Sequence, residues 1–320
     1  MGLTATKMGW DVKTTKSIQK KGATPPSWTV YADLEGNHPD RTFYDLYDSG
    51  YFTAKCGILG FIAEHLEEAR SFFSPHDFEL EDSDPARFKL EIYFSEFQCF
   101  EALFALLMAP FQPDPHCVYM SQYSPRNLKQ QVDAYLRGDI ASITMNRAQT
   151  KPEFLDLSVY SRFRSNESPE TWGENLESLA WLLDRMAHKY AGALEYNSYK
   201  HGLRVAYRGP SVFKLSSEDD AQVVKWESED SVWFMEVDGG ADPPVLKQAI
   251  KHFDLEESWH NLHLMKAIIE SIRVTRLARL IPGTQELVVK DFRGVDRSPV
   301  RKFWAKDFKF SLNIGKRPES

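Results

Sequence analysis

The chain is organised around the stretch Asn197-Ser198-Tyr199-Lys200-His201-Gly202, which ends its longest helical pattern and precedes its strands. Gly202 is typical of the position just after a helix, because glycine freely adopts the left-handed conformation found there. Lys200 and His201 place cations at the negative end of the helix dipole. One interpretation of this stretch is therefore a well-formed helix C-terminus with no further role.

The helix that this stretch ends is predicted to begin at Ser168, an N-cap residue followed by proline and an acid. Apolar residues then recur at spacings of three and four: Leu176, Leu179, Leu182, Leu183, Met186, Tyr190 and Leu194. On a continuous helix over 168–201, Asn197 shares a face with His201, and His188 shares one with Glu195. A second interpretation is that these side chains line a polar pocket between helices.

Another strong helix is predicted from Pro85 to about Met108, with apolar residues nearly all the way round, so that it should be buried on several sides. Glu96 and Glu101 lie among its phenylalanines. A buried carboxylate must find a partner, reach solvent or take up a proton. The alternative is an exposed acidic stripe, because glutamate is rarely fully buried.

The periodicity changes after Gly202. Four strands are predicted over 203–237, while 245–253 fits either a strand or a helix. A capping box at Asp254–Glu257 then begins a helix that runs to about Leu280. Two strand-like segments, over 286–292 and 302–313, follow it.

These elements predict a mainly α (α+β) fold. We expect a helical bundle with a small antiparallel sheet inserted before the last long helix and a short strand-rich C-terminus. The predicted organisation is an irregular arm over 1–40, a helical domain over 41–283 with its β insert at about 203–253, and a segment over 284–320 packed on that domain.

The composition of the chain argues against some classes of protein. The net charge of −7 argues against a general nucleic-acid binder, and 13% aromatic residues argue for a packed core. The three cysteines are odd in number and lack metal-ligand spacing, as in a reducing compartment. The N-terminus has no signal-peptide pattern, and the apolar run over 97–111 is too short and too polar to span a bilayer. We expect a cytoplasmic protein without a membrane partner.

Motifs for common chemistry are missing from the sequence. There is no nucleophile elbow, phosphate-binding loop or dinucleotide fingerprint. Glu257, His260 and His263 have helical spacing, but a di-iron or zincin motif is incomplete, so we expect no metal and no cofactor. Arg273, Arg276 and Arg279 form a basic stripe at i, i+3 and i+6.

The arginine stripe has two interpretations. With Lys200, Arg204 and Arg208 it could form a phosphate site if the two long helices pack together. The structural interpretation, which we favour, is that the arginines form ion pairs with Glu91, Glu96 and Glu101.

The apolar helix with Glu96 that ends before Pro110, combined with the helix end Tyr196–Gly202, resembles helical families of the HEPN type. It also resembles bacterial proteins with an Asn-x-x-Lys-His-Gly turn. The resemblance covers about 43–280 and implies a metal-independent ribonuclease acting at a homodimer interface. Asn197 and His201 match positions of the HEPN motif, whereas Tyr196 stands where these nucleases have arginine.

The resemblance implies a cytoplasmic HEPN-like protein. We expect it to bind or process RNA, or to bind a protein partner, in bacterial defence or stress. As a nuclease it would use His201 as general base, Asn197 to orient it, and Lys200 or Arg204 to hold the phosphate. Two alternatives stay open. One is a small-molecule site or enzyme with an interhelical pocket, for which the binding candidates are Glu96, Glu101, His188, Glu195, Arg273 and Arg276. The other is a non-catalytic protein-interaction scaffold.

Overall fold

The fold is given by a computed structural model that describes residues 38–76, 79–163, 167–200, 205–207, 209, 211–216, 223–228, 230–238, 245–281, 284–293 and 306–313. Its helices are α1 (Pro39–Leu46), α2 (Tyr51–Glu64), α3 (Leu66–Phe73), α4 (Asp84–Met108), α5 (His116–Gln122), α6 (Pro125–Leu136), α7 (Ile140–Ile143), α8 (Lys151–Ser158), α9 (Pro169–Ala191), α10 (Leu194–Lys200) and α11 (Leu255–Leu280). Its strands are β1 (Val205–Tyr207), β2 (Ser211–Ser216), β3 (Val223–Ser228), β4 (Ser231–Asp238), β5 (Val245–His252), β6 (Thr284–Asp291) and β7 (Lys306–Asn313).

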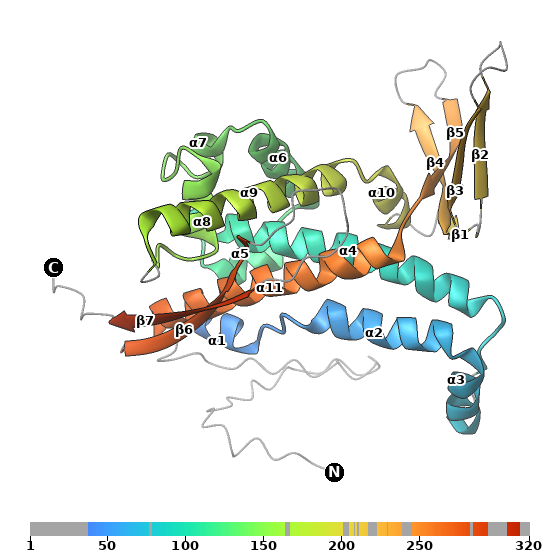
Figure 1. Ribbon diagram of the computed structural model, residues 1–320, viewed down its shortest axis with the longest axis horizontal. Helices are drawn as coiled ribbons and strands as arrows, with labels where there is room; N and C mark the ends of the chain where they lie inside the picture. The colour runs from blue at the N-terminus through green and yellow to red at the C-terminus, as the bar shows by residue number, and fades with distance from the viewer. Residues whose placement is uncertain are drawn as a thin grey trace, which may run out of the picture.

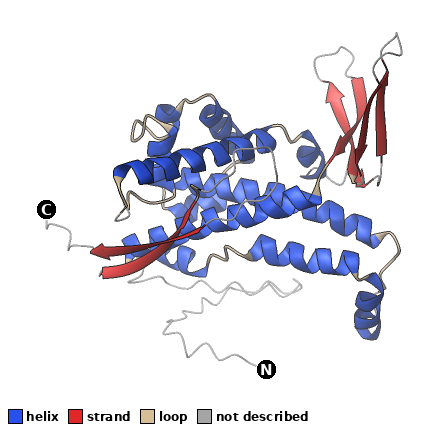
Figure 2. Ribbon diagram, in the orientation of Figure 1, coloured by secondary structure: helices blue, strands red, loops and turns tan. Residues whose placement is uncertain are grey.

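The protein is a mainly helical bundle with strands at its two ends, which confirms the predicted fold class (Figure 1, Figure 2). Helix α4 is central and packs against α2, α9 and α11. The antiparallel sheet β1-β4-β5 and the hairpin β2-β3 come before α11 in the chain, and the hairpin β6-β7 comes after it. The segment that the sequence left ambiguous is strand β5, paired with β4 along its whole length.

The core forms around α4 because its side chains are apolar on nearly every side. Phe94, Phe97, Phe100 and Phe104 are all fully buried. Extended through Phe111, this helix is the single one among the described residues with the length and composition to cross a membrane, and it is mostly buried inside the bundle. It serves as the core helix of this fold.

Two of the long helices begin at the predicted N-cap residues. Ser168 accepts a hydrogen bond from the Thr171 amide at the start of α9. Asp254 accepts from the amides of Glu256 and Glu257 at the start of α11. Both caps satisfy amide groups that a helix N-terminus leaves without intrahelical partners.

The single helix predicted over 168–201 is wrong, because the structure breaks it after Ala191 into α9 and α10. The break lies at Gly192, whose amide still bonds back to the His188 carbonyl. Glycine is a poor helix former, so the chain can turn there despite the apolar spacing that continues to Leu194. The predicted common face of His188 and Glu195 is lost with it. His188 is exposed, whereas Glu195 is buried.

Candidate functional site

Helix α4 and its neighbours carry several acidic side chains that are mostly withdrawn from solvent. Each one meets a lysine and at least one uncharged donor. The carboxylates are Glu91, Glu96, Glu101, Glu195 and Asp230, and their lysines are Lys55, Lys189, Lys200, Lys251 and Lys89 in the same order. We call these five sites the carboxylate–lysine sites.

The most buried of these carboxylates is Glu96, which has no exposed surface. Lys189 Nζ lies 2.9 Å from its Oε1. From α11, Ser258 Oγ donates to Oε2 at 2.7 Å and Asn261 Nδ2 donates to Oε1 at 2.6 Å. The Glu96 carboxylate therefore connects α4 with α9 and α11.

Lys189 is the cation of this site, and it also contacts Glu257 at 3.2 Å. Burial by itself would lower the pKa of Lys189, but the attraction of Glu96 and Glu257 outweighs it and raises that pKa. The ammonium group is therefore charged at neutral pH and neutralises a carboxylate that water does not reach.

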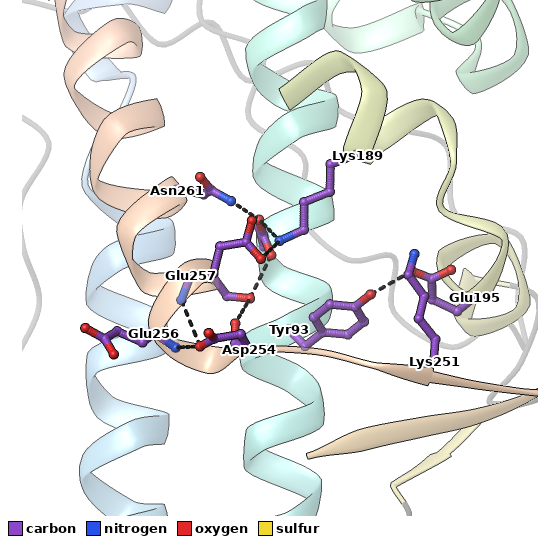
Figure 3. Close-up of polar contacts among 10 residues, drawn as sticks. Tyr93, Lys189, Glu195, Lys251, Asp254, Glu256, Glu257 and Asn261 are labelled. Atoms are coloured by element: carbon purple, nitrogen blue, oxygen red, sulfur yellow. Dashed lines mark hydrogen bonds and ion pairs between the residues drawn. The ribbon is translucent and has the colours of Figure 1, made fainter. Parts of the chain in front are cut away.

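Glu195 forms a similar site between α10, α4 and β5 (Figure 3). Its Oε1 accepts a hydrogen bond from the Tyr93 hydroxyl at 2.7 Å and lies 2.5 Å from Lys251 Nζ. Burial, followed by the negative charge of Glu195, raises the pKa of Tyr93. Tyr93 therefore acts as a hydrogen-bond donor at neutral pH and not as a base.

Helix α10 is held on α4 by two further sites. Tyr196 donates to Glu101 at 2.8 Å, and Lys200 Nζ lies 2.6 Å from the same carboxylate. One α-helical turn along α10 from Tyr196, Tyr199 donates to Glu91 at 2.7 Å, and its ring stacks on Phe94 with centroids 4.1 Å apart. Burial, followed by the charge of Glu101, raises the pKa of Tyr196, so this hydroxyl also stays a donor.

This arrangement favours a structural role for the acids over catalysis. A general acid or base needs a proton that it can exchange with a substrate. Here each carboxylate already binds an ammonium group and a neutral donor, and two of the donors, Tyr93 and Tyr196, hold their protons more tightly than an ordinary tyrosine. The sites fix how α2, α9, α10, α11 and β5 lie on α4.

Those candidate residues of the helix end and its pocket that the structure describes do not come together at one site. Asn197 is exposed on α10, and Lys200 is paired with Glu101. Glu96, Glu101 and Glu195 belong to three separate carboxylate–lysine sites, and His188 lies at the surface of α9. His201 and Arg204 lie outside the described residues.

The interpretation that the arginine stripe pairs with the glutamates of α4 is wrong. Glu96 meets α11 at Asn261, and Arg273 comes twelve residues later, about 18 Å further along the helix. Arg273 binds Glu270 at 2.8 Å. Arg279 lies over the ring of Phe163 at 5.0 Å.

Arg276 is buried at the C-terminal end of α8. Its Nη2 donates to the carbonyls of Leu157 and Ser158 at 3.0 and 2.7 Å, and the neighbouring Thr275 hydroxyl donates to Val159 O at 2.7 Å. These carbonyls are among those that a helix end leaves without intrahelical donors. Burial lowers the pKa of Arg276 to about 10, so the group remains a cation at neutral pH and suits a helix C-terminus.

The residues with metal-ligand spacing on α11 do not converge. Lys189 binds the Glu257 carboxylate, and the His263 ring contacts the Trp259 carbonyl at 2.9 Å. Burial lowers the pKa of His260. Across the described parts of the chain, no group of three His, Cys, Asp or Glu side chains could hold a metal ion.

A different feature lies on α2, along the edge of the bundle (Figure 1). Tyr51, Ala54, Ile58 and Phe61 are exposed and follow one another at spacings of three, four and three. The three large members leave 55%, 63% and 54% of their surfaces exposed. We call these four residues the α2 stripe.

The other side of α2 explains why this helix is apolar all round. Cys56 is fully buried, and Lys55 pairs with Glu91 of α4 at 2.6 Å. Gly57 and Gly60 face Trp259 of α11, and a Cβ at Gly60 would lie 3.4 Å from its indole ring. The α2 stripe was missed from the sequence, because hydrophobicity alone does not reveal which side of such a helix is covered.

Comparisons of the chain with protein-family models, with curated proteins and with solved structures give no match.

Proposed function

We propose that this protein works as a non-catalytic interaction scaffold and that the α2 stripe is its binding surface. The observation that carries the proposal is the continuity of the stripe: three large apolar side chains and one alanine are exposed on a single helix face. Single exposed apolar residues are normal on a protein, whereas contiguous apolar patches are typical of interaction surfaces.

The spacing of the stripe indicates what binds there. Apolar residues at alternating intervals of three and four form the seam by which one helix packs against another. Full burial of a large apolar side chain contributes about 1.5–3 kcal/mol, so covering three half-exposed ones would contribute roughly 3 kcal/mol. A helix with a matching apolar seam is the expected partner.

The helix that presents the stripe is already fixed in place. Cys56, the Lys55–Glu91 pair and the close approach of Gly57 and Gly60 to Trp259 hold the inner side of α2. A surface that is ordered before binding loses less conformational entropy when a partner arrives. This favours a function in recognition.

Photo-crosslinking tests the proposal. A benzophenone amino acid at position 58 should give discrete adducts in cells, whereas the same group at Gln130, exposed on α6, should not. Excess unlabelled wild-type protein should suppress adducts to any other protein, and the Ile58→Glu variant should not. Equal labelling from both positions, or adducts to another protein that wild-type chain does not suppress, would count against a scaffold that uses α2.

A second candidate is RNA binding or cleavage at the end of α10. The specific observation is that Tyr196, Tyr199 and Lys200 fix this helix on α4 while Asn197 points to solvent. In the HEPN-like proposal, this exposed amide stands four residues before His201. The chain would then present Asn197 to RNA from a helix fixed on α4, with His201 as the general base.

This candidate predicts cleavage of single-stranded RNA that persists in a metal chelator. His201→Ala and Asn197→Ala should abolish cleavage without changing the melting temperature, while His188→Ala, at an exposed position on α9, should leave it intact. Light scattering with the 260/280 nm absorbance ratio shows whether RNA co-purifies. Protein free of nucleic acid that cleaves no RNA would refute this candidate.

A further inference from the structure

We infer that the partner of the α2 stripe is the α2 stripe of a second copy of this chain, packed antiparallel about a two-fold axis. The inference rests on the proposed scaffold function and names its partner. Three properties of α2 carry it: the symmetry of the stripe along the helix, the sizes of its side chains, and the charges at its ends.

The stripe is symmetric about the level of Cys56. Tyr51 and Phe61 lie five residues on either side of it, and Ala54 and Ile58 lie two residues on either side. Two antiparallel copies related by a two-fold axis at this level would align Tyr51 with Phe61 of the second copy. Ala54 would align with Ile58 of the second copy.

Where the helices cross, these alignments place a large side chain opposite a small one. Each Ile58 would enter the space left by Ala54 of the other copy, as a knob enters a hole in paired helices. At both ends, a tyrosine would meet a phenylalanine, and aromatic pairs of this kind contribute about 0.5–1.5 kcal/mol beyond the area they bury. One sequence thus supplies both halves of a complementary surface.

The charges decide the orientation. Three exposed acids follow the C-terminal end of the stripe: Glu64, Glu68 and Glu67, of which Glu67 pairs with Arg70 at 2.6 Å. A parallel pair would bring the acids of both copies together, whereas an antiparallel pair separates them by the length of α2, about 21 Å and beyond the Debye length in physiological salt.

The opposite end of the stripe carries a cation. Lys266 Nζ lies 3.7 Å from where a Cβ at Gly50 would be. In the antiparallel pair, Glu64 of the second copy arrives at this end. Asp48 also lies there, and its carboxylate already accepts the Gly50 amide at 2.8 Å. Lys266 would then bridge between the acids of the two copies.

The contact is limited to one helix per copy, because the chain leaves the helical conformation at His65 before α3 begins. Interfaces of this small size usually belong to weak, reversible complexes. Analytical ultracentrifugation of the full chain should therefore show a mass that rises with concentration from 36.9 kDa towards twice that value in the micromolar range.

Two variants test the surface. Ile58→Glu should hold the protein at the monomer mass at all concentrations without a change in melting temperature. Met145→Glu should leave dimerisation unchanged. Met145 is 57% exposed and follows α7, a helix on the opposite side of the bundle from α2 (Figure 1). A wild-type protein that stays monomeric up to high micromolar concentration, or a dimer that survives Ile58→Glu, would overturn the inference.

Site-directed crosslinking tests the orientation. With a short bis-maleimide, a mixture of Tyr51→Cys and Phe61→Cys proteins should crosslink at least tenfold faster than either variant alone, because identical positions would lie about 15 Å apart along the antiparallel pair. Wild-type protein, with Cys56, Cys99 and Cys117, gives the background rate. Faster reaction of either single variant would indicate a parallel pair and overturn the antiparallel arrangement.

The two proposals fail in different ways. If the wild type is monomeric but the benzophenone at position 58 captures one other protein, with adducts that wild-type chain suppresses and Ile58→Glu does not, the scaffold function stands and the self-association inference is wrong. If position 58 gives neither dimer nor specific adduct, both fail.

Discussion

Replacing Lys189 with methionine is expected to lower the free energy of unfolding by about 3–5 kcal/mol, because it leaves a buried charge without a counter-ion. Glu96 has no exposed surface, and Lys189 is the cation that contacts it. Ser258 and Asn261 would remain as donors, but neither carries charge. Urea unfolding at pH 7 measures the loss.

The double variant Lys189→Met/Glu96→Leu should recover most of that stability, since replacing a whole buried pair with apolar groups is often nearly neutral. Glu257→Gln is the matched control. Its carboxylate is the other partner of Lys189, but it is half-exposed, so the change should be under about 1 kcal/mol. A loss below about 1 kcal/mol for Lys189→Met would show that Glu96 is not a buried anion.

The second large effect is expected at His116, which should make the protein sensitive to acid. Burial, followed by the charge of Arg276, lowers the pKa of His116 from 6.5 to about 4. Its Nδ1 lies 2.8 Å from the Tyr44 hydroxyl, within hydrogen-bond distance. The unfolded chain therefore takes up a proton at a higher pH than the folded one.

The sign of the pH dependence follows from this difference. The contribution of neutral His116 to stability is complete above pH 6.5 and is lost as the pH falls to about 4. The free energy of unfolding changes by roughly 3 kcal/mol over this range. His116→Asn keeps a hydrogen-bonding side chain beside Tyr44 but does not titrate. The stability of wild type and variant should therefore converge between pH 6.5 and 4. Asp40 and His38, two other titratable neighbours, are unchanged in both proteins. Parallel pH profiles would therefore contradict the assignment of this acid sensitivity to His116.

Local sequence signals predicted the helical framework well. The all-round apolar pattern before Met108 identified α4 as the core helix, and Ser168 and Asp254 marked the starts of α9 and α11. These signals succeed because capping and periodicity depend on residues within a few positions of one another. The mainly α fold with a strand insert followed from them.

The polar sites needed information that local patterns do not contain. Glu96 was recognised as a carboxylate in need of a partner, but Lys189 and Asn261 are 93 and 165 residues away in the chain. The break at Gly192 was missed because the apolar spacing continues across it. The face expected to join His188 with Glu195 was lost for the same reason.

The central position of α4 has a consequence for how the protein is made. Its most apolar helix is complete at Met108, but α11, which covers it, ends at Leu280. At a synthesis rate of about 5–20 residues per second, the ribosome needs roughly 10–30 s to make the intervening chain. During that time α4 lacks the helix that covers one of its apolar sides. The nascent chain should therefore bind strongly to chaperones that shield apolar segments.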